Sequence, residues 1–200
     1  MSIAVVAIGD GREEYHLSSA LSASEHLPLF DHYISVDDHT HELGYSGAIR
    51  EGWRRVLDTD AEYVFHLELD FMFLREVPLD RMIRLLDAEP HLAQVALVRQ
   101  PLNDAERAAG GLTELAMSEG GKHIFGDDDD QWIEHTRCFT TNPCVYPRWV
   151  VERGWPDCEQ SEGVFGISLL RDRPETRFAY WGGGEKWVEH IGDQRTGTGY

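Results

Sequence analysis

Hydrophobic residues along this chain occur either in short continuous runs or in longer segments where apolar positions recur every three or four residues. Continuous runs rich in β-branched and aromatic side chains predict buried strands, and the wider recurrence predicts amphipathic helices. The runs predict strands over residues 3–8, 32–36, 63–73, 92–98, 137–143 and 177–181. The recurring positions predict helices over residues 13–24, 46–57, 79–88, 148–154 and 158–171. This alternation predicts an α/β fold with a mostly parallel central sheet flanked by helices.

Two segments do not follow the alternation. Residues 103–135 contain two Gly-Gly pairs and the run Asp127 to Asp130, and they predict a helix piece with a mobile loop. The four aspartates lack the spaced pattern and terminal Glu of an EF-hand, which favours a solvated turn over a calcium site. Residues 182–200 are rich in glycine and polar side chains and predict a flexible tail that a ligand could order.

The run from Tyr63 to Phe73 carries two carboxylates near its end, Glu68 and Asp70. If the strand continues through both, a period of two puts them on the same side of the sheet. A buried carboxylate without a compensating cation loses much of its hydration free energy, and a divalent metal such as Mg²⁺ or Mn²⁺ is the usual partner. The alternative is a strand end whose acids simply reach water, and the spacing alone does not separate the two.

The composition bears on the number of domains, the class of partner and the localisation of the protein. Two hundred residues with 42% hydrophobic content predict one domain over residues 1–200. The net charge of −18 opposes non-specific attraction to nucleic acid or to an anionic membrane. No stretch has the pattern of a signal peptide or of a membrane span, and the three cysteines lack zinc-site spacing. We therefore expect a cytoplasmic protein.

The order of these features resembles the GT-A glycosyltransferases, most closely the family-2-like inverting enzymes that use a nucleotide-diphosphate sugar. In that family a strand ends in Val-Asp-Asp, as residues 36–38 do here, and a helix with a small-residue start and a basic residue follows, similar to residues 46–50. The metal strand of the family ends in Asp-x-Asp, where residues 68–70 read Glu-Leu-Asp. The resemblance runs along most of the chain and implies a single Rossmann-like GT-A domain.

The resemblance also implies roles on the donor side. Asp37 and Asp38 would recognise the nucleotide base or ribose, and Arg50 would face the diphosphate. Asp70 would be a ligand of Mn²⁺ or Mg²⁺. Glu68 replaces the acid that usually meets the ribose or a metal-bound water, so its direct role is open.

The later part of the family pattern is an Arg-containing helix ending in Gly-Phe or Gly-Trp, followed by Glu-Asp and an apolar helix. Residues 148–155 and 161–169 are similar, although Gly163 stands where the family has the Asp. Glu162 is then the candidate general base and Glu159 the reserve. A late histidine that completes the metal shell is similar in placement to His190, and Trp187 would stack on the sugar or nucleotide.

The sequence thus predicts a metal-dependent glycosyltransferase that moves a sugar from a nucleotide-diphosphate donor to an acceptor hydroxyl, with inversion. One alternative is a sugar nucleotidyltransferase, whose glycine-rich signature is absent from residues 9–12. Another is a non-catalytic module that binds a nucleotide or sugar. The acceptor could be a small molecule, a glycan, a protein or a modified DNA base, and no membrane partner is expected.

Each candidate residue also has a structural reading. Glu162 could cap its helix, and His190 could be a surface histidine. Arg50 could be a solvated helix residue, Asp37 and Asp38 a turn, and Trp187 a packing residue. Tertiary geometry has to distinguish these readings.

Overall fold

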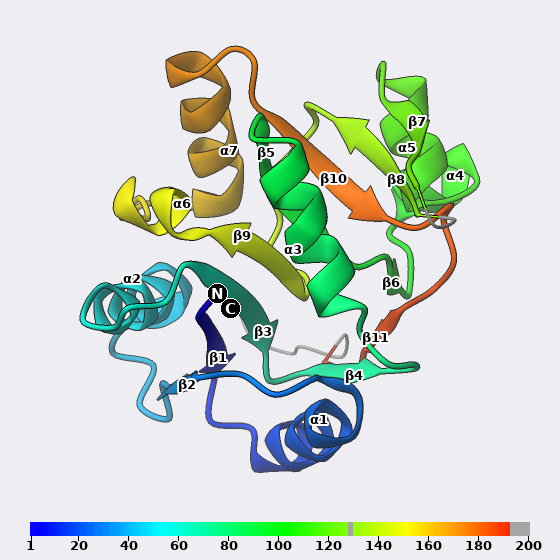
Figure 1. The fold of residues 1–200 in the computed structure, drawn as a ribbon. Helices are drawn as coiled ribbons and strands as arrows, with labels where there is room; N and C mark the ends of the chain where they lie inside the picture. Colours follow the sequence, from blue (N-terminus) through cyan, green and yellow to red (C-terminus); the bar gives the residue numbers. More distant parts are fainter. Residues whose placement is uncertain (128–129, 193–200) are drawn as a thin grey trace.

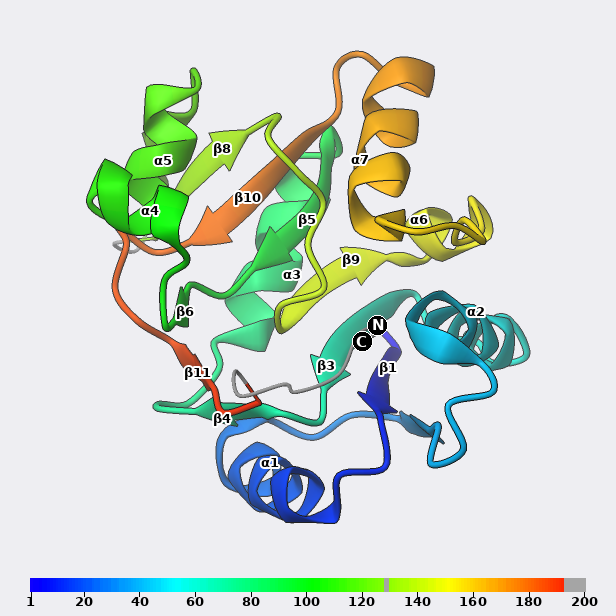
Figure 2. The same cartoon turned by 180° about the vertical axis from the view of Figure 1, so that it is seen from behind.

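The computed structural model describes residues 1–127 and 130–192, and Figures 1 and 2 show the arrangement of their elements. The helices are α1 (Glu13–His26), α2 (Gly44–Leu57), α3 (Leu79–Ala88), α4 (Asp104–Ala109), α5 (Leu112–Ser118), α6 (Arg148–Glu152) and α7 (Ser161–Asp172). The strands are β1 (Ile3–Gly9), β2 (His32–Asp37), β3 (Tyr63–Glu68), β4 (Phe71–Phe73), β5 (Leu92–Ala96), β6 (Arg99–Gln100), β7 (Lys122–Phe125), β8 (Gln131–His135), β9 (Cys144–Pro147), β10 (Arg177–Trp181) and β11 (Val188–His190).

Most strands belong to a central sheet. Within the described residues it has eight strands in the order β2-β1-β3-β9-β5-β10-β8-β7. Strand β1 pairs in parallel with β2 and β3, and β5 pairs in parallel with β10. Only β9 and β8 run against the others, because each pairs antiparallel with both of its neighbours. The expected α/β fold with a mostly parallel sheet is therefore confirmed.

Helices cover the sheet and close its core. Helix α3 crosses in front of β9 and β5 in Figure 1 and behind them in Figure 2, while α2, α6 and α7 lie beside one another in both views. All seven residues of β1 are buried, as expected for a strand inside a parallel sheet. The ring of Trp53 on α2 contacts the rings of Trp155 and Phe165, each at a centroid distance of 5.3 Å. These aromatic contacts join α2 to α7.

The run from Tyr63 to Phe73 is two strands in two sheets, so the prediction of one continuous strand is wrong. Strand β3 ends at Glu68, the Leu69 N–H donates to the Ile8 carbonyl at 2.7 Å, and the chain turns at Asp70. Strand β4 then joins a small three-stranded sheet in the order β4-β11-β6. Because of this turn, Glu68 and Asp70 do not belong to one strand, and the alternation that would put their side chains on the same side of a sheet does not apply.

The predicted strand over residues 137–143 is also wrong, because these residues form an irregular segment and the strand follows it as β9. The side-chain amide of Gln94 on β5 satisfies the backbone of Thr140, donating to its carbonyl at 2.6 Å and accepting from its N–H at 3.0 Å. A side chain thereby replaces the ladder hydrogen bonds that a strand would need.

Two further segments contain more regular structure than the sequence predicts. Residues 103–135 hold α4, α5, β7 and β8, and α4 begins with a reciprocal capping box between Asn103 and Glu106. In the expected flexible tail, residues 188–190 form β11, while residues 193–200 lie outside the described residues. Among the helices that the structure describes, none is both long and apolar enough to cross a membrane.

Helix α1 packs against β4 through small polar residues, whereas its leucines face outward. Ser19 and Ser22 are buried, while Leu17 and Leu21 are 65% and 57% exposed. The Ser22 hydroxyl donates to the Phe73 carbonyl at 3.1 Å and accepts from the Phe73 N–H at 2.7 Å. This exchange fixes α1 to the small sheet.

Close packing of α2 on the central sheet depends on Gly52. A Cβ there would lie 2.8 Å from Val6 Cγ1 and 3.3 Å from Ile8 Cδ1, two side chains of the buried strand β1. We expect Gly52→Ala to lower the free energy of unfolding by about 1–3 kcal/mol through overpacking. Chemical denaturation measures it. Gly163→Ala is the matched control, because nothing lies within 4 Å of its Cβ, and it should raise stability by about 0.5–1 kcal/mol. Equal effects of the two substitutions would contradict the packing argument.

Candidate active site

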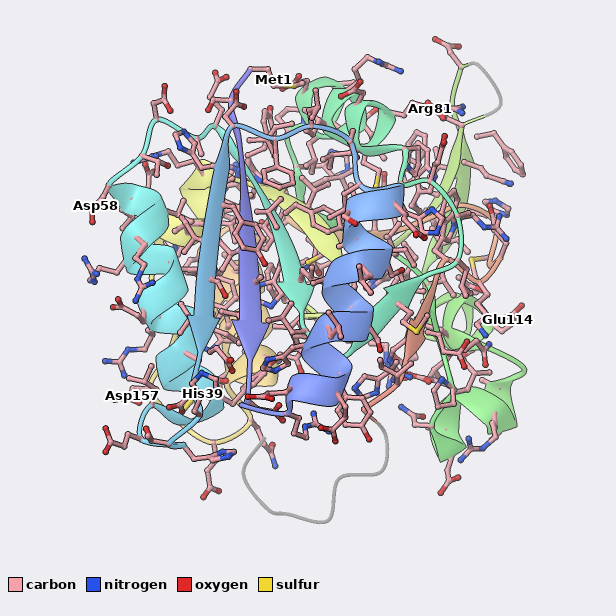
Figure 3. The ribbon with its side chains drawn as sticks, turned by 90° about the horizontal axis from the view of Figure 1, so that it is seen from below. Met1, His39, Asp58, Arg81, Glu114 and Asp157 are labelled. Atoms are coloured by element: carbon pink, nitrogen blue, oxygen red, sulfur yellow. The ribbon has the colours of Figure 1, made fainter. Side chains whose placement is uncertain are left out.

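A deep cleft opens beyond the carboxyl ends of the strands, where ligands bind in open α/β sheets. Its volume is about 1230 Å³. One wall comes from the start of α2 and the end of β3, the other from β6, α4 and the segment before β9, and the start of α7 closes the space between them. A smaller pocket of about 20 Å³ adjoins the cleft and shares Tyr45 and Glu68 with it. Figure 3 shows β1 and β2 side by side along their length, with the labelled His39 beyond their carboxyl ends.

Asp70 and His190 meet although 120 positions separate them in sequence. Strand β11 pairs antiparallel with β4, which sets His190 opposite Phe71, and the imidazole stacks on the Phe71 ring at 4.7 Å. The imidazole Nε2 lies 3.1 Å from Asp70 Oδ2. His190 lines the cleft, and Asp70 lines the small pocket and is only 4% exposed. The structure thus brings the two predicted metal ligands together.

The donor set of this pair fits a divalent ion only in part. A carboxylate oxygen and an imidazole nitrogen 3.1 Å apart can bind one ion, and Mg²⁺ or Mn²⁺ accepts both ligand types. Residues 1–127 and 130–192 contain no cluster of three or more His, Cys, Asp or Glu residues placed to hold a metal. An ion at Asp70 and His190 would therefore need phosphate oxygens or water to complete its shell, as Mg²⁺ sites in proteins commonly do.

A chain of hydrogen bonds connects Glu68 to Glu162 across the cleft. The Tyr45 hydroxyl donates to Glu68 Oε1 at 3.1 Å and also contacts the Thr141 hydroxyl. Thr141 in turn donates its backbone N–H and its hydroxyl to Glu162 Oε1, at 2.6 and 2.8 Å. Burial, followed by the nearby Glu162 and Glu68 charges, raises the pKa of Tyr45 well above its usual value, so this phenol stays protonated.

The position of Glu162 follows from the start of α7. The helix begins at Ser161, three residues later than predicted, so Glu162 lies in its first turn and Glu159 in the turn before it. Both carboxylates line the cleft. Both Thr141 donors bind Oε1, so this one oxygen anchors the carboxylate of Glu162. Sequence reasoning missed Tyr45 and Thr141, because an isolated Tyr or Thr carries no recognisable motif.

Asp37 lies in a group of acids and histidines at the ends of β1 and β2. Its Oδ1 accepts the Gly11 N–H at 2.8 Å, and its Oδ2 lies 3.2 Å from the ring nitrogens of His16 and His39. The other ring nitrogen of His16 is 3.7 Å from Asp10. Sequence reasoning missed His16, which reaches this position from the first turn of α1.

Asp38 is buried and binds the backbone of the segment that leads into α2. Its carboxylate oxygens accept the N–H groups of Glu42, Leu43 and Gly44 at 3.1, 3.0 and 2.9 Å. These are the first N–H group of α2 and the two before it, so the Asp38 carboxylate caps the entry to the helix, whose N-cap residue Leu43 makes no side-chain cap hydrogen bond. The geometry gives Asp38 a structural role beside its predicted role in nucleotide recognition.

Asp37 and Asp38 line neither the cleft nor the small pocket, and two further predicted donor-site residues also lie elsewhere. Arg50 is exposed on α2 and pairs with Asp157 at 2.6 Å on the rim, outside the set of cleft-lining residues. Trp187 is buried, because backbone hydrogen bonds to Val98 and Leu74 hold it between β6 and β4, and the Arg75 guanidinium covers its ring at 4.9 Å. This burial favours the packing reading of Trp187, and its stacking on a sugar or nucleotide stays a prediction.

Three arginines line the far wall and were not singled out from sequence. Arg99 pairs with Glu106 at 3.0 Å, Arg107 pairs with Asp104 at 2.5 Å, and Arg137 pairs with Glu119. Each guanidinium is thus neutralised by an acid from its own side of the cleft. The far wall is polar without being strongly basic.

Comparison with known proteins supports the fold. Neither a protein-family model nor a curated protein sequence matches the chain. Among solved structures, S. aureus TarS 1-349 in complex with UDP-GlcNAc matches 98% of this chain and 62% of its own, with a TM-score of 0.62 and 10% identity. The mannosyltransferase PcManGT from Pyrobaculum calidifontis, in complex with GDP-Man and Mn²⁺, matches 97% of this chain and 58% of its own, with a TM-score of 0.62 and 12% identity.

A third neighbour, A197 from STIV, matches 90% of this chain and 81% of its own, with a TM-score of 0.54 and 13% identity. The present chain spans about 60% of the TarS 1-349 chain in its complex with UDP. At these identities the likeness establishes the fold alone, which this chain shares with TarS 1-349 and with the mannosyltransferase PcManGT.

The structural role of Asp38 can be tested directly. We expect Asp38→Ala to lower the free energy of unfolding by about 1–2 kcal/mol, because three N–H groups lose their acceptor. Asp38→Asn keeps one acceptor oxygen and should lose less. Urea denaturation of the three proteins gives the order of their midpoints. An alanine variant as stable as the parent would contradict the capping role.

Proposed function

We propose that this chain is a metal-dependent glycosyltransferase that transfers a sugar from a nucleotide-diphosphate donor to an acceptor hydroxyl with inversion. The observation that carries the proposal is the Asp70–His190 pair at 3.1 Å beside the cleft that Glu162 lines. The fold is shared with a mannosyltransferase bound to GDP-Man and Mn²⁺ and with TarS bound to UDP-GlcNAc. Those ligands support a nucleotide-sugar as the donor class.

On the donor side, the group around Asp37 is the place for the nucleoside. The Asp37 carboxylate and the His16 and His39 rings offer acceptors and donors of the kind that base edges and ribose hydroxyls bind. Glu68 is the next carboxylate along the sheet edge. Asp70 and His190 would hold Mn²⁺ or Mg²⁺, which when bound supplies Lewis-acid neutralisation of the charge on the departing nucleotide diphosphate.

On the acceptor side, Glu162 acts as the general base. The acceptor oxygen forms its bond to the anomeric carbon as the bond from that carbon to the diphosphate oxygen breaks, and the hydroxyl proton passes to the Glu162 carboxylate. Thr141 holds Glu162 Oε1 with two donors, which leaves the plane of the carboxylate fixed for this proton transfer. Attack from the face opposite the leaving group inverts the anomeric centre.

The donor site can be tested by calorimetric titration of UDP, GDP and CDP with and without Mn²⁺. We expect one nucleotide to bind in the presence of Mn²⁺, and Asp70→Ala to weaken that binding by about 100-fold because a metal ligand is lost. Asp58→Ala, which removes a largely exposed carboxylate on the surface of α2, is the matched control. Binding that ignores both Mn²⁺ and Asp70 would exclude the assignment of the metal site.

The base can be tested by hydrolysis of the donor, in which water replaces the acceptor. We expect Glu162→Gln to slow release of the nucleotide diphosphate by about 10²–10⁴-fold while donor affinity stays unchanged. Thr141→Val removes one of the two donors to Oε1 and should slow release about tenfold, and Thr141→Ser should restore it. Full activity of Glu162→Gln would show that Glu162 is not the general base, and Glu159 would then be tested in the same way.

A further inference from the structure

The guanidinium of Arg12 links the separate segments that meet at Asp70. Arg12 follows β1, and its Nε donates to Asp10 Oδ2 at 2.7 Å. Its Nη2 donates to Asp70 Oδ2 at 3.0 Å, and its Nη1 lies 3.4 Å from the Gly192 carbonyl. The group lies over the Tyr15 ring at 4.6 Å, where a cation is attracted by the aromatic face. Arg12 therefore touches the end of β1, the turn after β3, the start of α1 and the segment after β11.

Arg12 and His190 contact the same oxygen of Asp70. Asp70 Oδ2 lies 3.0 Å from the guanidinium and 3.1 Å from the imidazole of His190. The carboxylates of Asp10 and Asp70 are 12% and 5% exposed, so water screens their charges little. A fixed cation between two such groups compensates their charge, as charge-assisted hydrogen bonds do in water-poor sites.

We propose that Arg12 is the built-in cation beside Asp70 and competes with the divalent ion for Asp70 Oδ2. The inference rests on the proposed function, in which Asp70 is a metal ligand. Two cations at contact distance on Oδ2 repel each other strongly, so an ion that binds Asp70 through Oδ2 displaces the guanidinium from that oxygen. Asp10 and the Tyr15 ring still hold Arg12 close to Asp70 after displacement.

The displaced guanidinium has a ligand of the right chemistry. A nucleotide diphosphate presents several anionic oxygens, and an arginine fork binds such oxygens with paired hydrogen bonds. Arg12 thus assists the diphosphate from the side of β1, whereas the expectation from sequence assigned that role to Arg50, which is on the rim with Asp157. The ion pair of Arg12 with Asp70, at 3.0 Å, already places the guanidinium where it could turn toward the diphosphate.

The first test is titration of the protein with MnCl₂ alone, with free Mn²⁺ followed by electron paramagnetic resonance. We expect Arg12→Gln to bind Mn²⁺ about tenfold more tightly than the parent, because the competitor is removed, and Arg12→Lys to lie between them. Arg99→Gln is the matched control, because it removes one positive charge from the far wall of the same cleft. Thermal unfolding establishes that each variant is folded.

Salt separates direct competition from a general effect of charge. We choose 0.5 M NaCl because it shortens the Debye length to roughly 4 Å. At this salt concentration Arg99→Gln should lose any gain in Mn²⁺ affinity, whereas Arg12→Gln should keep most of its gain. Equal gains in the two variants, or no gain in Arg12→Gln, would overturn the proposal. If Arg12→Gln does not fold, the same comparison with Arg99→Gln is made with Arg12→Lys, for which we expect a smaller gain in Mn²⁺ affinity.

The second test is titration with UDP and GDP in EDTA. We expect the parent to keep weak binding of one nucleotide, and Arg12→Gln to lose about tenfold of it. Binding unchanged by Arg12→Gln would overturn the assigned contact with the diphosphate. If no nucleotide binds the parent with or without Mn²⁺, the proposed function fails, while the Mn²⁺ titration of the free protein still decides whether Arg12 and the ion compete.

Discussion

Antiparallel pairing of β11 with β4 is the constraint on which the site depends. It sets His190 opposite Phe71, one position beyond Asp70, and so places an imidazole beside a buried carboxylate from a segment 120 residues earlier. The same small sheet includes β6, whose first residue, Arg99, begins the far wall of the cleft. Three short strands thus tie the two sides of the cleft together, and the turn at Asp70 is what allows β4 to leave the central sheet and join them.

Charge compensation explains how an acidic chain can collect carboxylates at the ends of its strands. Asp10 and Asp70 share the Arg12 guanidinium, and Asp37 faces two histidine rings and a backbone N–H. Asp38 is held by three backbone N–H groups at the start of α2. The net charge of −18 therefore says little about the cleft, because each of these acids lies against donors that the fold supplies.

Two hydroxyl side chains connect the two halves of the cleft, much as the Arg12 guanidinium connects Asp10 and Asp70. Tyr45 and Thr141 come from α2 and from the irregular segment before β9, and together they span the distance from Glu68 to Glu162. That segment is irregular because Gln94 binds its backbone, so the same departure from strand geometry that defeats sequence prediction also turns Thr141 toward Glu162. Local irregularity and the orientation of Thr141 toward the candidate base have one physical cause.

Sequence by itself determined the fold class, the approximate bounds of five helices and four strands, and the acids worth examining, because hydrophobic periodicity reports burial and Asp70 stands at the end of a buried run. It could not find the break at Leu69, since an apolar residue in an apolar run carries no turn signal. It left Trp187 open between stacking on a ligand and packing, and only the backbone hydrogen bonds to Val98 and Leu74 show why this residue is buried. Only tertiary structure decided that Arg12 contacts Asp70 and that Thr141 holds Glu162, because both contacts join segments whose separation in sequence encodes no distance in space.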